Sequence, residues 1–274
     1  MHALVDQRRP LSPGDRPTSI GVGRPHTLDA IWAARVEDLR EAQRLRYRVF
    51  AGELGARLSA PPGAPPGHDI DRFDEYCAHL LVRAIPADGD SPKVVGTYRV
   101  LTPKAAGRAG GLYSEMEFDL DRLAPLRPRM AELGRACVDP AWRTGGAILA
   151  LWSALGKFMI SHGLDVALGC ASVGLGDGGH EASALWHRLS ATRLAPLERR
   201  VKPLRPFPLL PSADQLPLRM PPLIKGYLNC GAELLGAPAW DHDFNTAELP
   251  MLMRFTDLPK RHRRHFLEPV IGRT

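Results

Sequence analysis

Three aspartates, Asp69, Asp71 and Asp74, stand within six residues, directly after a segment rich in proline and glycine. Carboxylates in such a loop suit the binding of a cationic group or the transfer of a proton. Three arginines flank this acidic loop along the chain: Arg46, Arg99 and Arg135. A guanidinium matches a carboxylate in geometry, so each arginine suits either a substrate carboxylate or an ion pair with the loop. The residues alone leave both roles open.

A second segment with chemical potential runs from Glu132 to Ala147 and includes Val138, Arg143, Thr144, Gly145 and Gly146. It reads as a strand, a glycine-bearing turn and the start of a helix. Free backbone N–H groups and the helix dipole favour an anion at such a start, and Arg143 adds donors suited to phosphate. The segment suits the phosphopantetheine arm or pyrophosphate of an acyl donor, although the two glycines alone equally suit an ordinary tight turn.

The composition places few limits on the partners of this chain. Its 274 residues are 44% hydrophobic and 24% charged, which is typical of a globular protein with a large core. The net charge of +6 favours acidic partners such as anionic lipid, an acidic carrier protein or phosphate groups, and no nucleic-acid motif is present. The four cysteines are widely spaced, so we expect reduced thiols and no metal site.

The apolar periodicity predicts an α/β (α+β) fold with a mixed sheet. The expected elements are a helix over 35–54, a hairpin of strands over 79–85 and 93–101, a strand over 130–138, a helix over 147–162, a strand over 164–173, a helix over 181–190, and late strands over 223–235 and 248–255. The eight prolines from Pro196 to Pro222 predict an extended insertion without regular structure. We expect a disordered leader over 1–26, one domain over 27–256 and a basic tail over 257–274.

Four motifs in one order resemble the GNAT-type acyltransferases: Arg46-Tyr47-Arg48-Val49-Phe50, the acidic loop, Val95-Gly96-Thr97-Tyr98-Arg99 and Glu132-Leu133-Gly134-Arg135. They are similar to two related families of that fold, the acyl-homoserine-lactone synthases and the ornithine N-acyltransferases that start ornithine-lipid synthesis. Three later segments resemble the ornithine acyltransferases: Leu164 to Ser172, Pro221 to Leu228, and Asp241 to Thr246.

The resemblance implies a mostly antiparallel sheet flanked by helices. It also implies transfer of a 3-hydroxy fatty acyl group from acyl carrier protein to the α-amino group of L-ornithine, with the carrier's phosphopantetheine thioester as donor and no separate cofactor. Glu132 is the expected base, with Asp71 as a second catalytic carboxylate. The expected substrate-binding residues are Arg46, Phe50, Asp69, Asp74, Arg99 and Arg135. The expected donor-binding residues are Val138, Arg143, Thr144, Gly145 and Gly146.

Two other functions remain open from the sequence. A homoserine-lactone synthase would use S-adenosylmethionine and would lack the proline-rich insertion. A non-catalytic GNAT-like module would bind carrier protein or membrane, but the acidic loop together with Glu132 argues against it. Without an apolar run of ~20 residues, we expect a cytoplasmic protein. The basic tail, with Lys260, Arg261, Arg263 and Arg264, makes the inner membrane face a candidate peripheral contact.

Overall fold

The computed structural model describes residues 26–143, 146–211 and 220–258. Four segments lie outside the described residues: residues 1–25 of the predicted leader, Thr144 and Gly145, residues 212–219 of the proline-rich insertion, and residues 259–274 of the predicted basic tail. His26, the last residue of the predicted leader, is instead the first residue of a strand.

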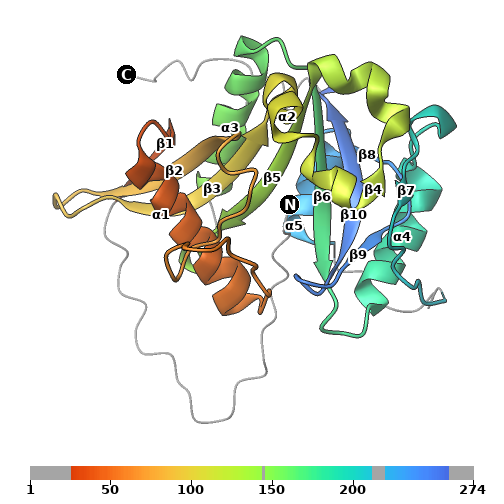
Figure 1. Cartoon of the computed structure of the whole chain (residues 1–274), viewed down its shortest axis with the longest axis horizontal. Coiled ribbons are helices and arrows are strands. Elements are labelled where there is room, and N and C mark those ends of the chain that lie inside the picture. Colours follow the sequence, from red (N-terminus) through yellow and green to blue (C-terminus); the bar gives the residue numbers. More distant parts are fainter. Residues whose placement is uncertain (1–25, 144–145, 212–219, 259–274) are drawn as a thin grey trace.

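An eight-stranded mixed sheet forms the centre of the molecule (Figure 1). Its strands are β1 (His26–Trp32), β2 (Ala78–Pro86), β3 (Lys93–Leu101), β5 (Met130–Val138), β6 (Val166–Gly174), β8 (Glu233–Leu234), β9 (Ala239–Asp241) and β10 (Thr246–Arg254). The order is β1-β2-β3-β5-β6-β10-β8, with β9 paired to β10. The β5–β6 pair is parallel and the other neighbouring pairs are antiparallel. Strands β4 (Phe118–Asp119) and β7 (Lys202–Pro203) form a separate small sheet.

Helices cover both faces of this sheet (Figure 1). They are α1 (Val36–Tyr47), which continues as a π-helical turn over Arg48–Glu53, α2 (Pro103–Ala109), α3 (Gly146–Ser161), α4 (His180–Arg193) and α5 (Pro222–Asn229). Shorter 3₁₀ turns occupy Tyr113–Met116, Asp121–Arg129, Pro140–Trp142, Leu197–Arg199 and Phe255–Asp257.

Strand alternation decides which helix each strand residue meets. On β2, Leu80 and Val82 join the apolar cluster that includes Leu151 of α3, whereas Leu81 joins Leu45 of α1 in another cluster. Successive side chains of a strand point to opposite faces, so α1 and α3 lie on opposite sides of the sheet. The acidic loop follows α1 and lies on the α1 side, where Asp69 N–H donates to the backbone carbonyl of Gln43.

The two parallel strands at the centre of the sheet separate after a short paired stretch. Strand β5 pairs with β6 only through Met130–Val166, Ala131–Ala167 and Glu132–Leu168. Beyond these pairs β5 continues along β3, and β6 continues along β10 (Figure 1). The facing edges of β5 from Leu133 and of β6 from Gly169 therefore leave this ladder and open a wedge in the sheet.

Most of the expected elements are confirmed, and two expectations are wrong. The predicted strand over 223–235 is largely the helix α5, because Ile224, Tyr227 and Leu228 recur at helical spacing and a proline is tolerated in the first helical turn. The proline-rich insertion also contains the short strand β7, which pairs with β4. Helix α2 was not predicted at all.

We find no helix in the described part of the chain with both the length and the apolar character that a membrane crossing requires.

Candidate active site

The three arginines and three aspartates singled out from the sequence form one closed ring of ion pairs on the α1 side of the sheet. Arg46 bridges Asp69 and Asp74, with N···O distances of 2.8 and 2.7 Å. Arg99 bridges Asp74 and Asp71 at 3.0 and 2.7 Å. Arg135 bridges Asp71 and Asp69 at 3.0 and 3.1 Å. Each acid contacts two arginines and each arginine contacts two acids, so the charges of the ring balance.

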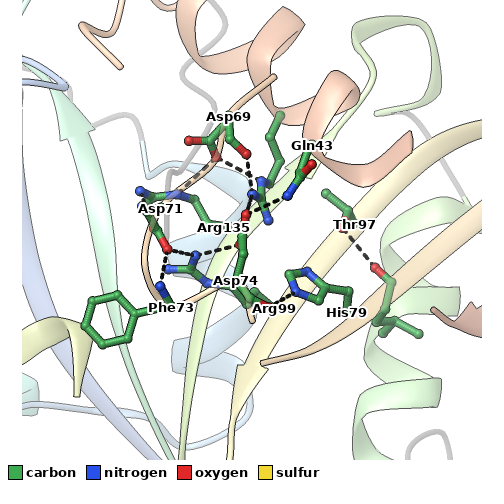
Figure 2. A network of polar contacts seen from close by, with 11 residues as sticks. Gln43, Asp69, Asp71, Phe73, Asp74, His79, Thr97, Arg99 and Arg135 are labelled. Carbon is green, nitrogen blue, oxygen red and sulfur yellow. Dashed lines mark hydrogen bonds and ion pairs between the residues drawn. The ribbon is translucent and has the colours of Figure 1, made fainter. Parts of the chain in front are cut away.

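The sheet supplies the geometry that brings Arg135 into this ring. Glu132 and Gly134 face the α1 side, and regular alternation would turn Arg135 to the other face together with Leu133. Instead Arg135 has a left-handed φ of 50°, and the β3–β5 register shifts between Thr97 and Arg99. Such a bulge places two successive positions on one face. Figure 2 shows Arg135 reaching Asp69 and Asp71, and Arg99 reaching Asp71 and Asp74.

Burial and mutual charge set the protonation of this ring. Burial raises the pKa of Asp74, but Arg46 and Arg99 outweigh burial and hold that pKa well below its usual range. The pKa of Asp71 is lowered in the same way, by Arg99 and Arg135 against burial. Burial lowers the pKa of the neighbouring His79 to about 4, with Asp74 opposing that shift. Asp71 and Asp74 are therefore ionised at neutral pH, and His79 is neutral.

A pocket opens beside the ring, at the point where β5 and β6 separate. Its lining combines arginines, carboxylates and aromatic rings: Phe73, Cys77, Arg99, Leu101, Tyr113, Ser114, Glu117, Glu132, Leu133, Gly134, Arg135, Cys170, Asp241 and Glu248. Of the residues expected to take part in the reaction or bind substrate, Arg99, Glu132 and Arg135 line this pocket. Arg46, Phe50 and the three loop aspartates lie outside its lining. Phe50 is fully buried, with its ring centroid 5.7 Å from that of Phe244.

The turn that begins at Tyr113 holds Glu132 in the lining of this pocket. Its two carboxylate oxygens accept the backbone N–H groups of Tyr113 and Ser114, at 2.6 and 2.7 Å. The carboxylate thus satisfies free N–H groups at the start of a 3₁₀ turn, and the same turn fixes the position of Glu132 in the pocket. Its role as a base stays a prediction.

Val138 ends β5, and Arg143 and Gly146, two more of the expected donor-binding residues, follow it in the described chain. Arg143 donates to both carboxylate oxygens of Glu53, at 2.6 and 2.5 Å, and its Nε donates to the backbone carbonyl of Val138 at 3.2 Å. Gly146 begins α3, and a Cβ there would stand 2.9 Å from a methyl carbon of Leu28. Glycine therefore allows α3 to pack closely on β1. Donor binding by these residues stays a prediction.

Two apolar pockets lie on the opposite face of the sheet from the ring. One is lined by Leu133, Trp152, Leu155, Tyr227, Cys230, Met253, Phe255 and Leu258. The other is lined by Leu133, Ala167, Leu168, Gly169, Tyr227, Ala232, Met251 and Met253. Leu133 belongs to both linings and to that of the polar pocket. The polar and apolar pockets therefore share Leu133 as a common wall, close to the point where β5 leaves β6.

Three acidic residues of the polar pocket, Glu117, Asp241 and Glu248, were not singled out from the sequence. Glu117 lies in a loop with no local motif. Glu248 does carry a signal in the sequence, because it is a charged residue inside the apolar strand β10. Asp241 was noted only as part of a resemblance.

Comparisons with known proteins agree with this fold. A model of the acetyltransferase (GNAT) domain matches residues 45–153. A CoA-dependent acyl-homoserine lactone synthase solved with SAM and isopentyl-CoA superposes with a TM-score of 0.51 at 18% identity, covering 90% of this chain and 93% of the other. At this low identity the likeness shows the fold alone.

Two curated relatives cover nearly the whole chain. The L-ornithine N(alpha)-acyltransferase of Rhizobium meliloti (strain 1021) is 33% identical over 260 residues, 91% of this chain and 88% of the relative. The protein of the same name from Brucella abortus (strain 2308) is 35% identical over 256 residues, 89% of this chain and 90% of the relative. The chain is an acyltransferase and belongs to the L-ornithine N(alpha)-acyltransferase family.

Proposed function

We propose that this protein transfers a 3-hydroxy fatty acyl group from acyl carrier protein to the α-amino group of L-ornithine, the first step of ornithine-lipid synthesis. The observation that carries the proposal is the wedge between β5 and β6, where Leu133 lines both a charged pocket on one face of the sheet and apolar pockets on the other. A zwitterionic acceptor suits the charged pocket, and an acyl chain suits the apolar ones. The names of the relatives support ornithine as the acceptor.

In the proposed reaction the α-amine nitrogen attacks the thioester carbonyl carbon. An amide bond forms, the C–S bond breaks, and the carrier leaves as a thiol that takes up one proton. The amine must lose a proton to react, and Glu132 is the proposed base, with Asp71 as the second carboxylate. Backbone N–H groups of β5, freed where it leaves β6, are proposed to stabilise the oxyanion.

Arg99 and Arg135 are proposed to bind the carboxylate of the acceptor. Their hydrogen bonds to the acidic loop use Nη1 of Arg99, and Nε and Nη2 of Arg135. Other N–H groups of both guanidiniums lie outside the ring of ion pairs. Arg46, Phe50, Asp69 and Asp74 then support the site from behind, by holding these two arginines and the acidic loop in place.

The donor is proposed to bind at the start of α3, where Val138, Arg143, Thr144, Gly145 and Gly146 follow one another along the chain. Helix N–H groups there suit the phosphate of the carrier's phosphopantetheine arm. Because Glu53 already holds Arg143, the guanidinium must exchange that carboxylate for the phosphate. Acyl carrier protein and the anionic inner membrane face are the proposed partners of the basic tail.

The test uses the purified full chain with 3-hydroxyacyl carrier protein and ornithine, followed by mass spectrometry. We expect N-acyl ornithine and free carrier thiol in equal amounts. Release of thiol without an N-acyl product, or a lactone formed only when S-adenosylmethionine is added, would overturn the proposal.

A further inference from the structure

Glu117, Asp241 and Glu248 bring three carboxyl groups to one side of the polar pocket. A carboxylate oxygen of Glu117, one of Glu248 and the sulfur of Cys170 all lie within 4.8 Å of one another. Glu117 and Glu248 are 6% and 2% exposed. Two carboxylates so close in a buried site cannot both ionise without a large cost, unless a cation lies between them.

The described residues supply no such cation. None of the ion pairs found among them involves Glu117, Asp241 or Glu248. Glu248 accepts hydrogen bonds from the hydroxyls of Ser172 and Thr246 at 2.9 and 2.7 Å, and Asp241 accepts two backbone N–H groups. Within the described chain no group donates a hydrogen bond to the carboxylate of Glu117, although this side chain is more than nine-tenths buried and faces the pocket.

The opposite side of the same pocket is cationic. Arg99 and Arg135 line it there, and the guanidinium carbon of Arg135 lies 4.9 Å from the centre of the Tyr113 ring. Burial raises the pKa of Tyr113 to about 12, with Arg135 opposing the shift and Glu117 adding to it. Tyr113 thus lies close to Arg135, and the lining of the pocket offers both cationic and acidic side chains to one small molecule.

We propose that Glu117 and Glu248, with Asp241 beside them, bind the side-chain ammonium of a diamino acid acceptor. These three residues are called the acid group below. This inference rests on the proposed function, because it places the acceptor carboxylate at Arg99 and Arg135. An ammonium carries three N–H donors, which match three converging carboxyl groups. The acid group therefore selects acceptors with a cationic side chain and leaves the α-amine toward the wedge.

A metal ion is a poorer occupant of the same position. Metal binding by cysteine requires the thiolate, and burial together with Glu117 and Glu248 raises the pKa of Cys170 well above its usual value. A metal ion that recruits Cys170 must first displace the thiol proton, so it binds against that raised pKa. An organic cation needs no ligand from Cys170.

The test compares ornithine with norvaline, which has the same carbon chain without the side-chain ammonium. We expect kcat/KM of the wild type to favour ornithine by at least about 100-fold, as for sites built to bond a polar substrate group. In the double variant Glu117→Gln/Glu248→Gln this preference should nearly vanish, mainly because kcat/KM for ornithine falls. Glu117→Gln alone should lower it in part, and Glu198→Gln, at an exposed position outside the pocket, should keep it.

Direct binding separates this inference from the acyl transfer reaction. Calorimetric titration of the full chain with ornithine and with norvaline needs no acyl donor. Ornithine binding that is lost in the double variant supports the inference even if no acyl transfer occurs. An unchanged preference in a cooperatively folded double variant would overturn it. It would also be overturned if the wild type bound Zn²⁺ at this position and did not distinguish the two amino acids.

Discussion

The ring of ion pairs lies beside the polar pocket, and the acid group is part of the lining of the same pocket. Both regions bury charged groups, but only the ring contains the opposite charges that balance them. In the ring, three guanidiniums and three carboxylates alternate, so every charge has two opposite neighbours. In the acid group, the described residues provide three carboxyl groups and no cation. A balanced cluster holds a structure together without a ligand. An unbalanced one needs a positive charge that the described residues do not supply.

The carboxyl pKa values differ between the two regions in the way that this difference in charge balance predicts. The pKa of Asp74 is lowered, since Arg46 and Arg99 outweigh burial. The pKa of Glu117 is raised well above its usual value by burial and by Glu248, and burial likewise raises that of Glu248. Ionisation of Asp74 therefore stabilises the folded protein, whereas ionisation of Glu117 and Glu248 destabilises it until a cation binds.

The largest effect on turnover is expected between the two regions, at Glu132. Glu132→Gln removes the proposed base, and general-base catalysis contributes about 100-fold to 10,000-fold. We expect kcat for acyl transfer to fall by that factor. Glutamine also loses one acceptor for the Tyr113 turn, so part of the stability should be lost as well.

Glu115→Gln is the matched control for this change. Glu115 accepts the backbone N–H of Leu112 at 2.6 Å at the same turn but lies outside the polar pocket's lining. Thermal melting of both variants measures damage to the turn, and carrier-dependent kinetics measure catalysis. Equal losses of kcat in the two variants would mean that Glu132 acts through the turn alone.

Breaking the ring should lower the free energy of unfolding more than it lowers the affinity for ornithine. Asp74→Asn leaves Arg46 and Arg99 without a shared carboxylate in a buried position, and breaking such a pair typically costs about 3–5 kcal/mol of unfolding free energy. Urea unfolding measures the loss. Glu37→Gln, which removes an exposed pair with Arg44, should leave the urea midpoint unchanged. A midpoint for Asp74→Asn equal to that of the wild type would contradict a structural ring.

Asp71 tests whether the ring also contacts the acceptor, because its side chain is 19% exposed against 3% and 5% for Asp69 and Asp74. We expect Asp71→Asn to raise KM for ornithine about tenfold, which corresponds to the loss of one charge-assisted hydrogen bond. Melting and steady-state kinetics are measured together. A lower melting temperature with unchanged KM would assign Asp71 to structure alone.

The smallest expected effect is the pH dependence of stability, and its sign differs between the regions. Asp74 contributes stability above the unfolded pKa of about 4, and that contribution is lost as pH falls below it. The lowered pKa of His79 acts in the same sense between its unfolded value of about 6.5 and about 4. Glu117 and Glu248 have raised pKa values, so their contribution is complete below about pH 4 and is lost as pH rises through the folded values.

Urea unfolding without ligand at pH 4 and pH 7 tests this contrast. We expect Glu117→Gln/Glu248→Gln to be more stable than the wild type at pH 7, and the advantage to disappear at pH 4. Added ornithine should raise the stability of the wild type more than that of the double variant. A double variant that is less stable than the wild type at pH 7 would show that these carboxyl groups already have stabilising partners.

The sequence predicted the ring's members but not their pairing. Residues over 93–101 and 130–138 have the alternation of strands, and both strands begin and end as expected. The bulge at Arg135 has no signature in the sequence, because a left-handed arginine depends on contacts with Asp69 and Asp71 that lie far away along the chain. Which acid meets which arginine is decided by that bulge.

The wrong prediction for residues 223–235 and the missed residue Glu117 have the same cause, because both depend on contacts between distant parts of the chain. Residues 223–235 are apolar enough for either a strand or a helix, and α5 forms because Ile224 and Tyr227 enter the apolar core on one helical face. Glu117 has no local feature that marks it, and its importance appears only when β10 brings Glu248 beside it. Pocket residues contributed by separate loops cannot be assigned from the spacing within each loop.

Ornithine labelled with ¹⁵N at either the α or the side-chain nitrogen tests the central claim most directly. If Arg99 and Arg135 hold the carboxylate and the acid group holds the side-chain ammonium, only the α-amine reaches the thioester. Tandem mass spectrometry of the product formed from 3-hydroxyacyl carrier protein should then find the amide on the α nitrogen alone. An amide on the side-chain nitrogen, or a mixture of both, would contradict the account.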